Sequence, residues 1–285
     1  MTDGNESTMD AKSKPFGMIT LDQVGKEYDN KTVLKDIRMQ IDKGQSIAIT
    51  GHNGCGKSTL LKIIAGLVEP SKGKVKYDRQ LIFHYVPEHF PGMPMTAEKY
   101  LISQGILAGL NKTEAGKRIK TLSEEFFLDS MLKTSMKHLS KGSLQKVAVI
   151  QALLKEPDVL LLDEPLSGQD VASQQVFIDK VNALRKKGVV ILMSCHEPFL
   201  TDAISDTVYQ LENGVLTLTE KRNLTEKTWF ILEFTSSDTC TVPPQWEGRL
   251  QYVEKGCILR VEEKDCNEAA LSMLQNGWNL RGVHQ

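Results

Sequence analysis

The sequence contains no apolar run that approaches the roughly 18 residues needed to cross a lipid bilayer. Its longest apolar runs, Val159–Leu162 and Val189–Met193, have the length of strands. It also lacks an excess of either charge, because 35 Lys and Arg residues stand against 36 Asp and Glu residues. This balance excludes a chain-wide basic surface for nucleic acid. The first residues carry no apolar core of the signal-peptide type, so we expect no signal peptide.

Cysteine and aromatic residues are also few. The five cysteines are odd in number and form no metal-like CxxC pair, which favours reduced thiols in the cytosol over a disulfide framework. Aromatic residues make up only 6% of the chain, but 40% of all residues are hydrophobic. This content is enough for a packed core and excludes a wholly disordered chain. At roughly 150 residues per domain, the length corresponds to about two domains.

Residues 1–15 form a polar lead, which we expect to be flexible. The rest of the chain divides into two regions with different patterns of apolar and polar residues. Residues 16–217 alternate short apolar runs with helical patterns, with the helical patterns dense between about 90 and 156. This alternation predicts an α/β domain with a mostly parallel sheet. Residues 218–285 predict a small α+β C-terminal domain. We expect strands at 45–50, 159–162, 189–193, 228–235, 249–254, 257–262 and 278–283, and helices at 58–67, 97–110, 113–127, 143–155, 172–187 and 267–275.

A glycine-rich segment between an expected strand and an expected helix matches the pattern GxxxxGK[ST] of a phosphate-binding loop. Glycines let backbone N–H groups curl around phosphate oxygens, and the helix N-terminus adds about half a positive charge. Lys57 can reach the β- and γ-phosphates of a nucleoside triphosphate, and the Ser58 hydroxyl can ligate Mg²⁺. The predicted nucleotide-binding residues of this segment are Gly51, His52, Asn53, Gly54, Cys55, Gly56, Lys57, Ser58 and Thr59.

Two carboxylates, Asp163 and Glu164, follow directly after the expected strand at 159–162. A buried parallel strand delivers the residues that follow it to the carboxyl edge of the sheet, where open α/β sheets bind ligands. Asp163 is therefore a candidate to hold Mg²⁺ through water. Glu164 is the candidate base for the water that attacks the terminal phosphate. Glu164 and Lys57 are thus predicted catalytic residues.

The string Leu139-Ser140-Lys141-Gly142-Ser143 resembles the LSGGQ signature of ATP-binding cassette (ABC) proteins. Three further matches follow in the order of that family. Tyr28 resembles the aromatic residue that stacks on adenine, Ser167-Gly168-Gln169-Asp170 resembles the D-loop, and His196 resembles the switch histidine. The resemblance covers about 18–217 and implies a P-loop NTPase fold of the ABC type, with an antiparallel β part and a helical lobe. For Tyr28, ordinary packing in the core is the alternative.

The resemblance also implies a head-to-tail dimer of cassettes that binds ATP and Mg²⁺. Ser140 and the backbone of Gly142 in one copy would bind the γ-phosphate held by the loop of the other copy. This is physically reasonable because Ser140 opens a helix, and a helix N-terminus attracts anions. His196 would act in catalysis by donating to the γ-phosphate, and Asp170 would contact the opposite copy. Hydrolysis of ATP would then release the dimer.

Three positions depart from the family pattern. Glu88 replaces the usual Q-loop glutamine, which adds a carboxylate near the metal and makes Glu88 another candidate metal ligand. Lys141 and Ser143 replace the glycine and glutamine of LSGGQ, whereas Ser140 and Gly142 are kept. The PE dipeptide of the Q-loop and the LSKG string look like the cassettes of exporters that move drugs, peptide antibiotics or sodium. We therefore expect an exporter.

ATP hydrolysis must drive work, and the sequence holds no membrane span, so the resemblance implies a separate integral membrane permease. It also implies a second cassette, identical or related, and a cytoplasmic chain held at the inner face of the membrane by the permease. The segment that would receive the permease is His89–Lys99. Its apolar residues Phe90, Met93 and Met95 either form an exposed docking patch or cover the core of the helical lobe.

Two other functions remain open at the level of the sequence. A soluble cassette ATPase of DNA repair or translation usually carries a long coiled-coil insertion or two cassettes in tandem. This sequence has one cassette, no heptad run and no basic stripe, and we expect no nucleic-acid partner. A weakly catalytic ATP-binding switch that pairs with another cassette is suggested by the altered Glu88, Lys141 and Ser143. The retained Glu164 and His196 argue against it.

Overall fold

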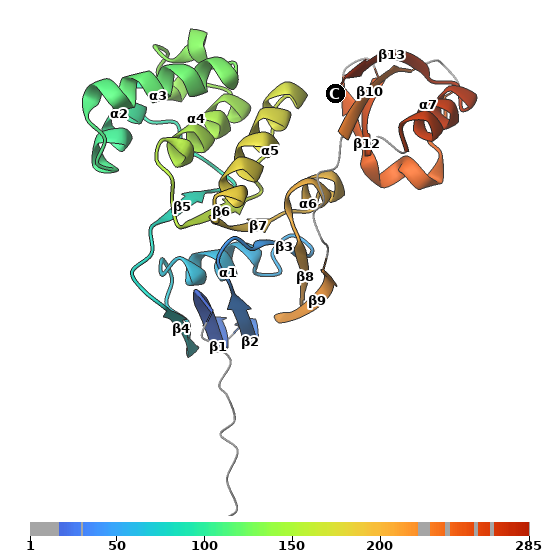
Figure 1. Cartoon of the computed structure of the whole chain (residues 1–285). Coiled ribbons are helices and arrows are strands. Elements are labelled where there is room, and N and C mark those ends of the chain that lie inside the picture. The colour runs from blue at the N-terminus through green and yellow to red at the C-terminus, as the bar shows by residue number, and fades with distance from the viewer. Residues whose placement is uncertain are drawn as a thin grey trace, which may run out of the picture.

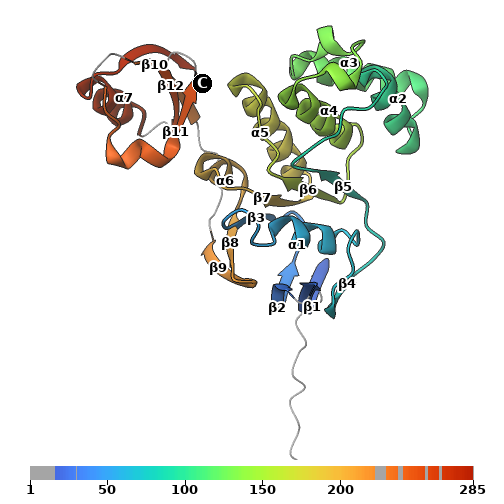
Figure 2. The same ribbon diagram turned by 180° about the vertical axis from the view of Figure 1, so that it is seen from behind.

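The structure is a computed structural model that describes residues 17–29, 31–221, 229–236, 240–253, 256–262 and 265–284. The lead expected over residues 1–15 lies outside these ranges. The chain forms three sheets with helices between and around them (Figures 1 and 2). Within these ranges, no helix combines the length and the hydrophobicity that a membrane-spanning segment requires.

Every helix and strand expected from the sequence is present, together with additional elements that the patterns did not predict. The strands are β1 (Ile19–Tyr28), β2 (Lys31–Ile41), β3 (Ser46–Thr50), β4 (Lys72–Tyr77), β5 (Phe83–Val86), β6 (Val159–Asp163), β7 (Val190–Ser194), β8 (Thr207–Glu212), β9 (Val215–Lys221), β10 (Trp229–Thr235), β11 (Leu250–Val253), β12 (Gly256–Glu262) and β13 (Asn279–His284). The helices are α1 (Lys57–Ile64), α2 (Ala97–Leu107), α3 (Lys112–Glu125), α4 (Lys141–Leu153), α5 (Val171–Lys186), α6 (Pro198–Ile204) and α7 (Cys266–Gln275), with 3₁₀ turns at Asp129–Met131, Met136–His138 and Pro244–Arg249. The additional elements are β1, β2, β4, β5, β8, β9 and α6.

Two helices end a full three residues earlier than their apolar spacing predicted. We expected helices to continue to residues 67 and 110, but α1 ends at Ile64 and α2 ends at Leu107. The reason lies in two glycines, Gly66 and Gly109, whose φ angles of 71° and 88° are left-handed. A glycine in this conformation terminates a helix and satisfies its last carbonyl groups.

The central sheet has the strand order β5-β6-β7-β3-β8-β9 and is parallel except for the β8–β9 pair. Its inner strands are covered on both faces, and successive residues of a strand point to opposite sides, so neighbouring residues of one strand belong to different cores. In β6, Leu160 and Leu162 belong to the core shared with α4 and α5, whereas Leu161 belongs to the core shared with α1. The antiparallel sheet β2-β1-β4 covers α1 from its other side (Figure 1). The ends of β3, β5, β6 and β7, which precede predicted site residues, therefore lie at the same edge of this sheet.

The helical lobe consists of α2, α3 and α4. The apolar residues of His89–Lys99 were expected either to form an exposed docking patch or to cover the core of this lobe, and both cases occur. Phe90 and Met93 are partly buried against the core of the lobe, and the Phe90 ring packs edge-on to Tyr100 with centroids 5.6 Å apart. Met95 is 40% exposed. Core packing therefore explains Phe90 and Met93, and of the three residues only Met95 is exposed.

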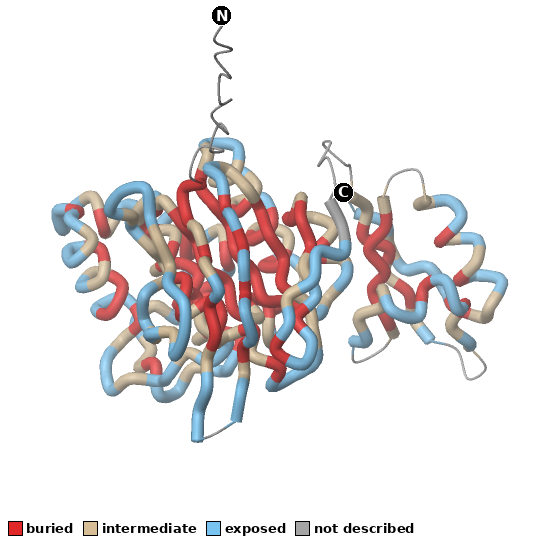
Figure 3. The backbone as a smooth tube through the Cα atoms, turned by 90° about the horizontal axis from the view of Figure 1, so that it is seen from below, coloured by how far each residue is buried: buried red, intermediate tan, exposed pale blue. Residues whose placement is uncertain are grey.

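The C-terminal residues form a separate antiparallel sheet, β11-β12-β10-β13, with α7 packed against it. This sheet has its own hydrophobic core, in which Leu232, Trp246, Leu259 and Met273 are buried. Figure 3 shows these buried residues as a group apart from those of the larger body. The strands expected at 228–235 and 249–254 correspond to β10 and β11, and residues 228 and 254 lie outside the described ranges.

Candidate active site

The phosphate-binding loop connects β3 to α1, as the sequence predicted. Gly51 has a φ of 144°, and a Cβ built there would lie 2.3 Å from the carbonyl oxygen of Leu211. Gly56 has a φ of 111° at the residue before α1, and a Cβ there would lie 2.8 Å from Val33. Larger residues are therefore excluded at both positions by conformation and by space.

Lys57 lies inside the curl of this loop. Its side chain is almost fully buried, and its Nζ donates to the carbonyl oxygens of Gly51 at 2.8 Å and His52 at 3.3 Å. The same nitrogen lies 3.9 Å from Oε1 of Glu164. The loop thus holds a positive charge at its centre, next to the predicted base.

A cavity of about 340 Å³ opens beside Lys57. It is lined by Tyr28, Val33, Asn53, Gly54, Gly56, Lys57, Ser58, Thr59, Glu88, Asp163 and Glu164. Most of the predicted nucleotide-binding residues therefore share one cavity. Cys55 is an exception, because its side chain is buried in the core below the loop. Gly51 and His52 do not line the cavity, and the His52 ring nitrogen Nδ1 lies 2.9 Å from the carbonyl oxygen of Asn53.

Tyr28 lies at the end of β1, on the rim of this cavity. The side chain is not a core residue, because 45% of its surface is exposed. The Nζ of Lys26 lies 4.8 Å from the centre of its ring. An exposed aromatic face at the mouth of a phosphate-binding cavity is suited to stacking on a base. The core-packing alternative for Tyr28 is therefore wrong.

Asp163 is the last residue of β6 and is 2% exposed. It accepts hydrogen bonds from the hydroxyl groups of Ser58 at 2.9 Å, of Tyr85 at 2.8 Å and of Ser194. Burial and the bond to Asp163 raise the pKa of Tyr85 well above its ordinary value, so Tyr85 remains a donor. Tyr85 and Ser194 were missed by sequence reasoning, since only the pairing of β5 and β7 with β6 brings them to this carboxylate.

Glu164 has a φ of 47°, an unusual left-handed conformation for a residue with a side chain. Its Oε2 lies 2.7 Å from Nδ1 of His196, which follows the adjacent strand β7. Its Oε1 is buried and has no hydrogen-bond partner among the residues described. Burial raises the pKa of Glu164, although the nearby His196 and Lys57 act in the opposite direction. The carboxyl group therefore binds a proton more strongly than an exposed glutamate does.

The signature residues lie on a different element from the loop. Ser140 caps α4, where its Oγ accepts from the backbone N–H of Ser143 at 3.1 Å, and its side chain is exposed. Gly142 packs against the D-loop, because a Cβ there would lie 2.0 Å from the carbonyl oxygen of Gly168. Ser140 and Gly142 are both described, and neither lines the cavity around Lys57. Within one chain, the structure does not bring these two residues to the phosphate loop.

Asp170 ends the D-loop and caps α5, accepting from the backbone N–H of Ser173 at 2.9 Å. Its Oδ2 also accepts from Nζ of Lys146 at 2.6 Å, which ties α5 to α4. Burial disfavours the charge of Asp170, but the bonds from Lys146 and Ser173 outweigh it and lower the pKa. The carboxylate is therefore engaged inside its own chain, and a contact with a second copy stays a prediction.

Glu88 follows β5 and is exposed, with its Oε1 3.6 Å from Nε2 of His89. It lines the cavity around Lys57, as expected for a candidate metal ligand. The neighbouring Pro87 carbonyl oxygen accepts from the side chain of Gln145 at 2.9 Å. Gln145 lies in α4 and is 1% exposed. This partly buried bond connects the Q-loop to the signature helix.

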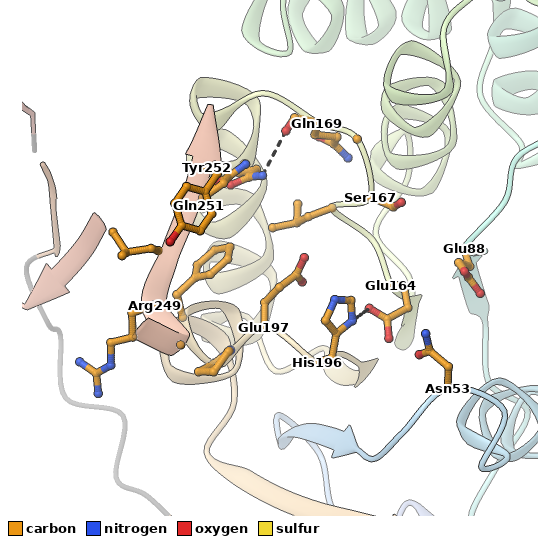
Figure 4. A pocket seen from close by; sticks show the side chains of 17 residues that line it. Asn53, Glu88, Glu164, Ser167, Gln169, His196, Glu197, Arg249, Gln251 and Tyr252 are labelled. Carbon is orange, nitrogen blue, oxygen red and sulfur yellow. Dashed lines mark hydrogen bonds and ion pairs between the residues drawn. The ribbon is translucent and has the colours of Figure 1, made fainter. Parts of the chain in front are cut away.

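A second cavity, of about 560 Å³, continues from Glu164 and His196 towards the C-terminal domain. Figure 4 shows it between Glu88 and Asn53 on one side and Tyr252 on the other, with Glu164, His196 and Glu197 between them. Its lining includes the D-loop residues 167–169 and residues 248–252 from β11 and the turn before it. Glu164, His196 and Glu197 offer ligand atoms within 4.8 Å of one another, a cluster that sequence reasoning did not predict.

Comparison with known proteins gives consistent results. The family model described as ABC transporter matches residues 34–167. The chain is 34% identical over 213 residues to the ABC transporter ATP-binding protein NatA of Bacillus subtilis, which covers 69% of this chain and 87% of NatA. It is 32% identical over 202 residues to the zinc import ATP-binding protein ZnuC of Pseudomonas fluorescens, covering 70% of this chain and 75% of ZnuC. A solved structure of an ATP-binding subunit of an ABC transporter superposes with a TM-score of 0.66 at 30% identity, covering 73% of this chain and 90% of that one.

Proposed function

Because this chain belongs to the ATP-binding subunits of ABC transporters and is an ATPase of that family, we propose that its ATP hydrolysis drives transport through a separate membrane permease. Two cassettes would close around ATP, and hydrolysis would let them part. What supports this function most directly is the geometry at Glu164. One of its carboxylate oxygens is held by His196. The other is buried, has no hydrogen-bond partner among the described residues and forms an ion pair at 3.9 Å with Lys57 Nζ.

In this proposal, Glu164 is the general base. A carboxylate with one oxygen held and one free can orient a water and accept its proton. The raised pKa of Glu164 makes that proton transfer more favourable than it would be to an exposed glutamate. His196 keeps the carboxylate in place and has a second ring nitrogen to donate to a phosphate oxygen. Lys57 places a positive charge where negative charge develops on the phosphoryl group.

Mg²⁺ fits the donors at the end of β6. Ser58 Oγ and Asp163 Oδ1, which are 2.9 Å apart at the cavity, are hard oxygen ligands of the kind that Mg²⁺ prefers. Ser58 would hold the ion directly and Asp163 through water, and Glu88 is an additional candidate from the cavity wall. When bound, Mg²⁺ neutralises charge on the phosphate oxygens. The hydroxyl groups of Tyr85 and Ser194 would keep the Asp163 carboxylate oriented.

A second copy of the chain, or a related cassette, would complete the site. Ser140 is exposed at the N-terminus of α4, where free N–H groups and the helix dipole favour an anion. Lys57 and Ser140 lie on separate elements of one chain, so a phosphate held by the loop is available to Ser140 of another copy. This arrangement accounts for the presence of both the phosphate loop and the signature segment in one sequence.

The direction of transport remains a prediction. Export was expected from the PE dipeptide and the LSKG string, but the similar proteins include ATP-binding subunits whose name specifies zinc import. Their similarity therefore favours neither direction. The paired Glu164 and His196 also make the weakly catalytic switch less attractive, since a switch has no need of a held base.

The substitution Glu164→Gln tests the function. It keeps the size of the side chain and removes its basicity, so we expect the variant to bind ATP, to accumulate as a dimer and to lose nearly all turnover. The measurements are phosphate release and size-exclusion chromatography with MgATP. Glu69→Gln, at an exposed carboxylate that lines neither cavity, is the matched control and is expected to retain wild-type turnover. Equal turnover by the Glu164 variant would remove the base from this proposal.

A further inference from the structure

Arg260 of the C-terminal domain contacts two segments of the active site. It lies in β12 and is only 5% exposed. Its Nη2 donates to the carbonyl oxygen of Val171, the first residue of α5, at 3.2 Å. The carbon at the centre of its guanidinium group lies 4.6 Å from the centre of the Phe199 ring in α6. One buried side chain therefore touches both helices that follow the catalytic edge.

Both contacted helices are continuous with catalytic residues. Val171 follows the D-loop, which begins three residues after Glu164. The Ser167 N–H donates back to the Glu164 carbonyl oxygen at 3.4 Å. Phe199 stands three residues after His196. Because Glu164 and His196 are bonded to each other at 2.7 Å, the position of either segment sets that contact.

Stability alone does not explain Arg260. A buried guanidinium needs partners for all of its N–H groups, but the Nε and Nη1 atoms of Arg260 have none among the described residues. Burial lowers the pKa of Arg260 to about 10, and the nearby Glu197 opposes this effect. The group thus remains charged at neutral pH while incompletely paired. An apolar residue at this position would cost less free energy than a partly paired charge.

We propose that Arg260 is a positioning residue for ATP hydrolysis. Through Arg260, the C-terminal domain holds the D-loop helix α5 and the switch segment 196–199 in fixed positions relative to each other. The inference rests on the proposed function, since it concerns the same Glu164–His196 pair. It assigns the C-terminal domain a role in the catalytic step: when β12 shifts, the contact between His196 and Glu164 shifts with it.

The test uses the full chain with Arg260→Met, which keeps the length of the side chain and removes its charge and hydrogen bond. We expect kcat to fall about tenfold, because even a 1 Å misplacement of a catalytic group can cost about 100-fold. KM for ATP and the binding of a fluorescent ATP analogue are expected to stay unchanged, since Arg260 does not line the nucleotide cavity. Arg260→Lys should restore part of kcat. The matched control is Arg281→Met, which removes an exposed arginine from β13 of the same domain and should leave kcat unchanged.

Phe199→Leu tests the same contact from the cassette side and does not depend on the stability of β12. It should lower kcat, and adding Arg260→Met to it should lower kcat by less than the product of the two single effects. A purely structural Arg260 would instead lower thermal stability and ATP affinity together, with no rescue by lysine, and this result would overturn the proposal. Wild-type kcat in both Arg260→Met and Phe199→Leu would also overturn it. The proposed function would survive that result as long as the wild type and Glu164→Gln still differ in turnover.

Discussion

Replacing Gly142 by alanine tests how closely the signature helix packs on the D-loop. A Cβ at this position would lie 2.0 Å from the carbonyl oxygen of Gly168 and 3.0 Å from its carbonyl carbon. Ordinary van der Waals contact begins near 3.4 Å. Both obstructing atoms belong to the backbone, so no side-chain rotation relieves the clash. Either α4 or the D-loop must move by about 1 Å or more, because packed interiors contain no spare space.

The magnitude of the effect follows from this displacement. Overpacking of this kind costs about 1–3 kcal/mol, which for a domain of about 200 residues lowers the melting temperature by roughly 2–12 °C. The D-loop follows Glu164 in the chain, so a shift of about 1 Å should also reduce kcat by up to about 100-fold. This loss does not require a phosphate contact by Gly142, because it arises within one chain.

Calorimetry and phosphate release measure the two effects. Gly116→Ala in α3 is the matched control, because a Cβ there meets no atom within 4 Å. In a helix interior, alanine is about 0.5–1 kcal/mol more favourable than glycine, so the control should be slightly more stable and fully active. A Gly142→Ala variant with wild-type melting temperature and kcat would refute the packing argument.

Two further predictions concern ionisable groups. Glu164 has a raised pKa in the folded state, so its contribution to stability is greatest at low pH and is lost as the pH rises through that folded value. The Glu164→Gln variant should therefore melt at a higher temperature than the wild type near pH 8, and the difference should shrink towards about pH 5. Equal melting temperatures at every pH would contradict the burial of an ionised carboxylate. Lys146→Met breaks the 2.6 Å ion pair with Asp170. Because that carboxylate is half exposed, we expect the free energy of unfolding measured in urea to fall by about 1–2 kcal/mol, which is less than the cost of breaking a fully buried pair. Lys137→Met, at an exposed lysine before the signature, should leave the unfolding free energy unchanged.

The local patterns of the sequence were sufficient for the phosphate loop and for most of the helices and buried strands, but they did not predict β1, β2, β4, β5, α6, β8 and β9. The loop from Gly51 to Ser58 is one continuous segment whose chemistry is set by its own glycines, lysine and hydroxyl group. Apolar runs such as 159–162 are long enough only for buried strands, and a parallel sheet delivers the next residues to its carboxyl edge. For this reason Lys57, Ser58, Asp163 and Glu164 could be assigned to one cavity before the structure was known.

Only the tertiary structure decided which residues support that cavity and how the two domains meet. Tyr85 and Ser194 reach Asp163 because β5, β6 and β7 are neighbours in the sheet, an order that no local pattern specifies. Gly142 looked like a phosphate contact in sequence, and its packing against Gly168 appears only when α4 meets the D-loop. Arg260 is one arginine among many until β12 places it on α5 and α6. Local spacing is set by a few covalently linked residues, whereas these contacts depend on the packing of distant segments.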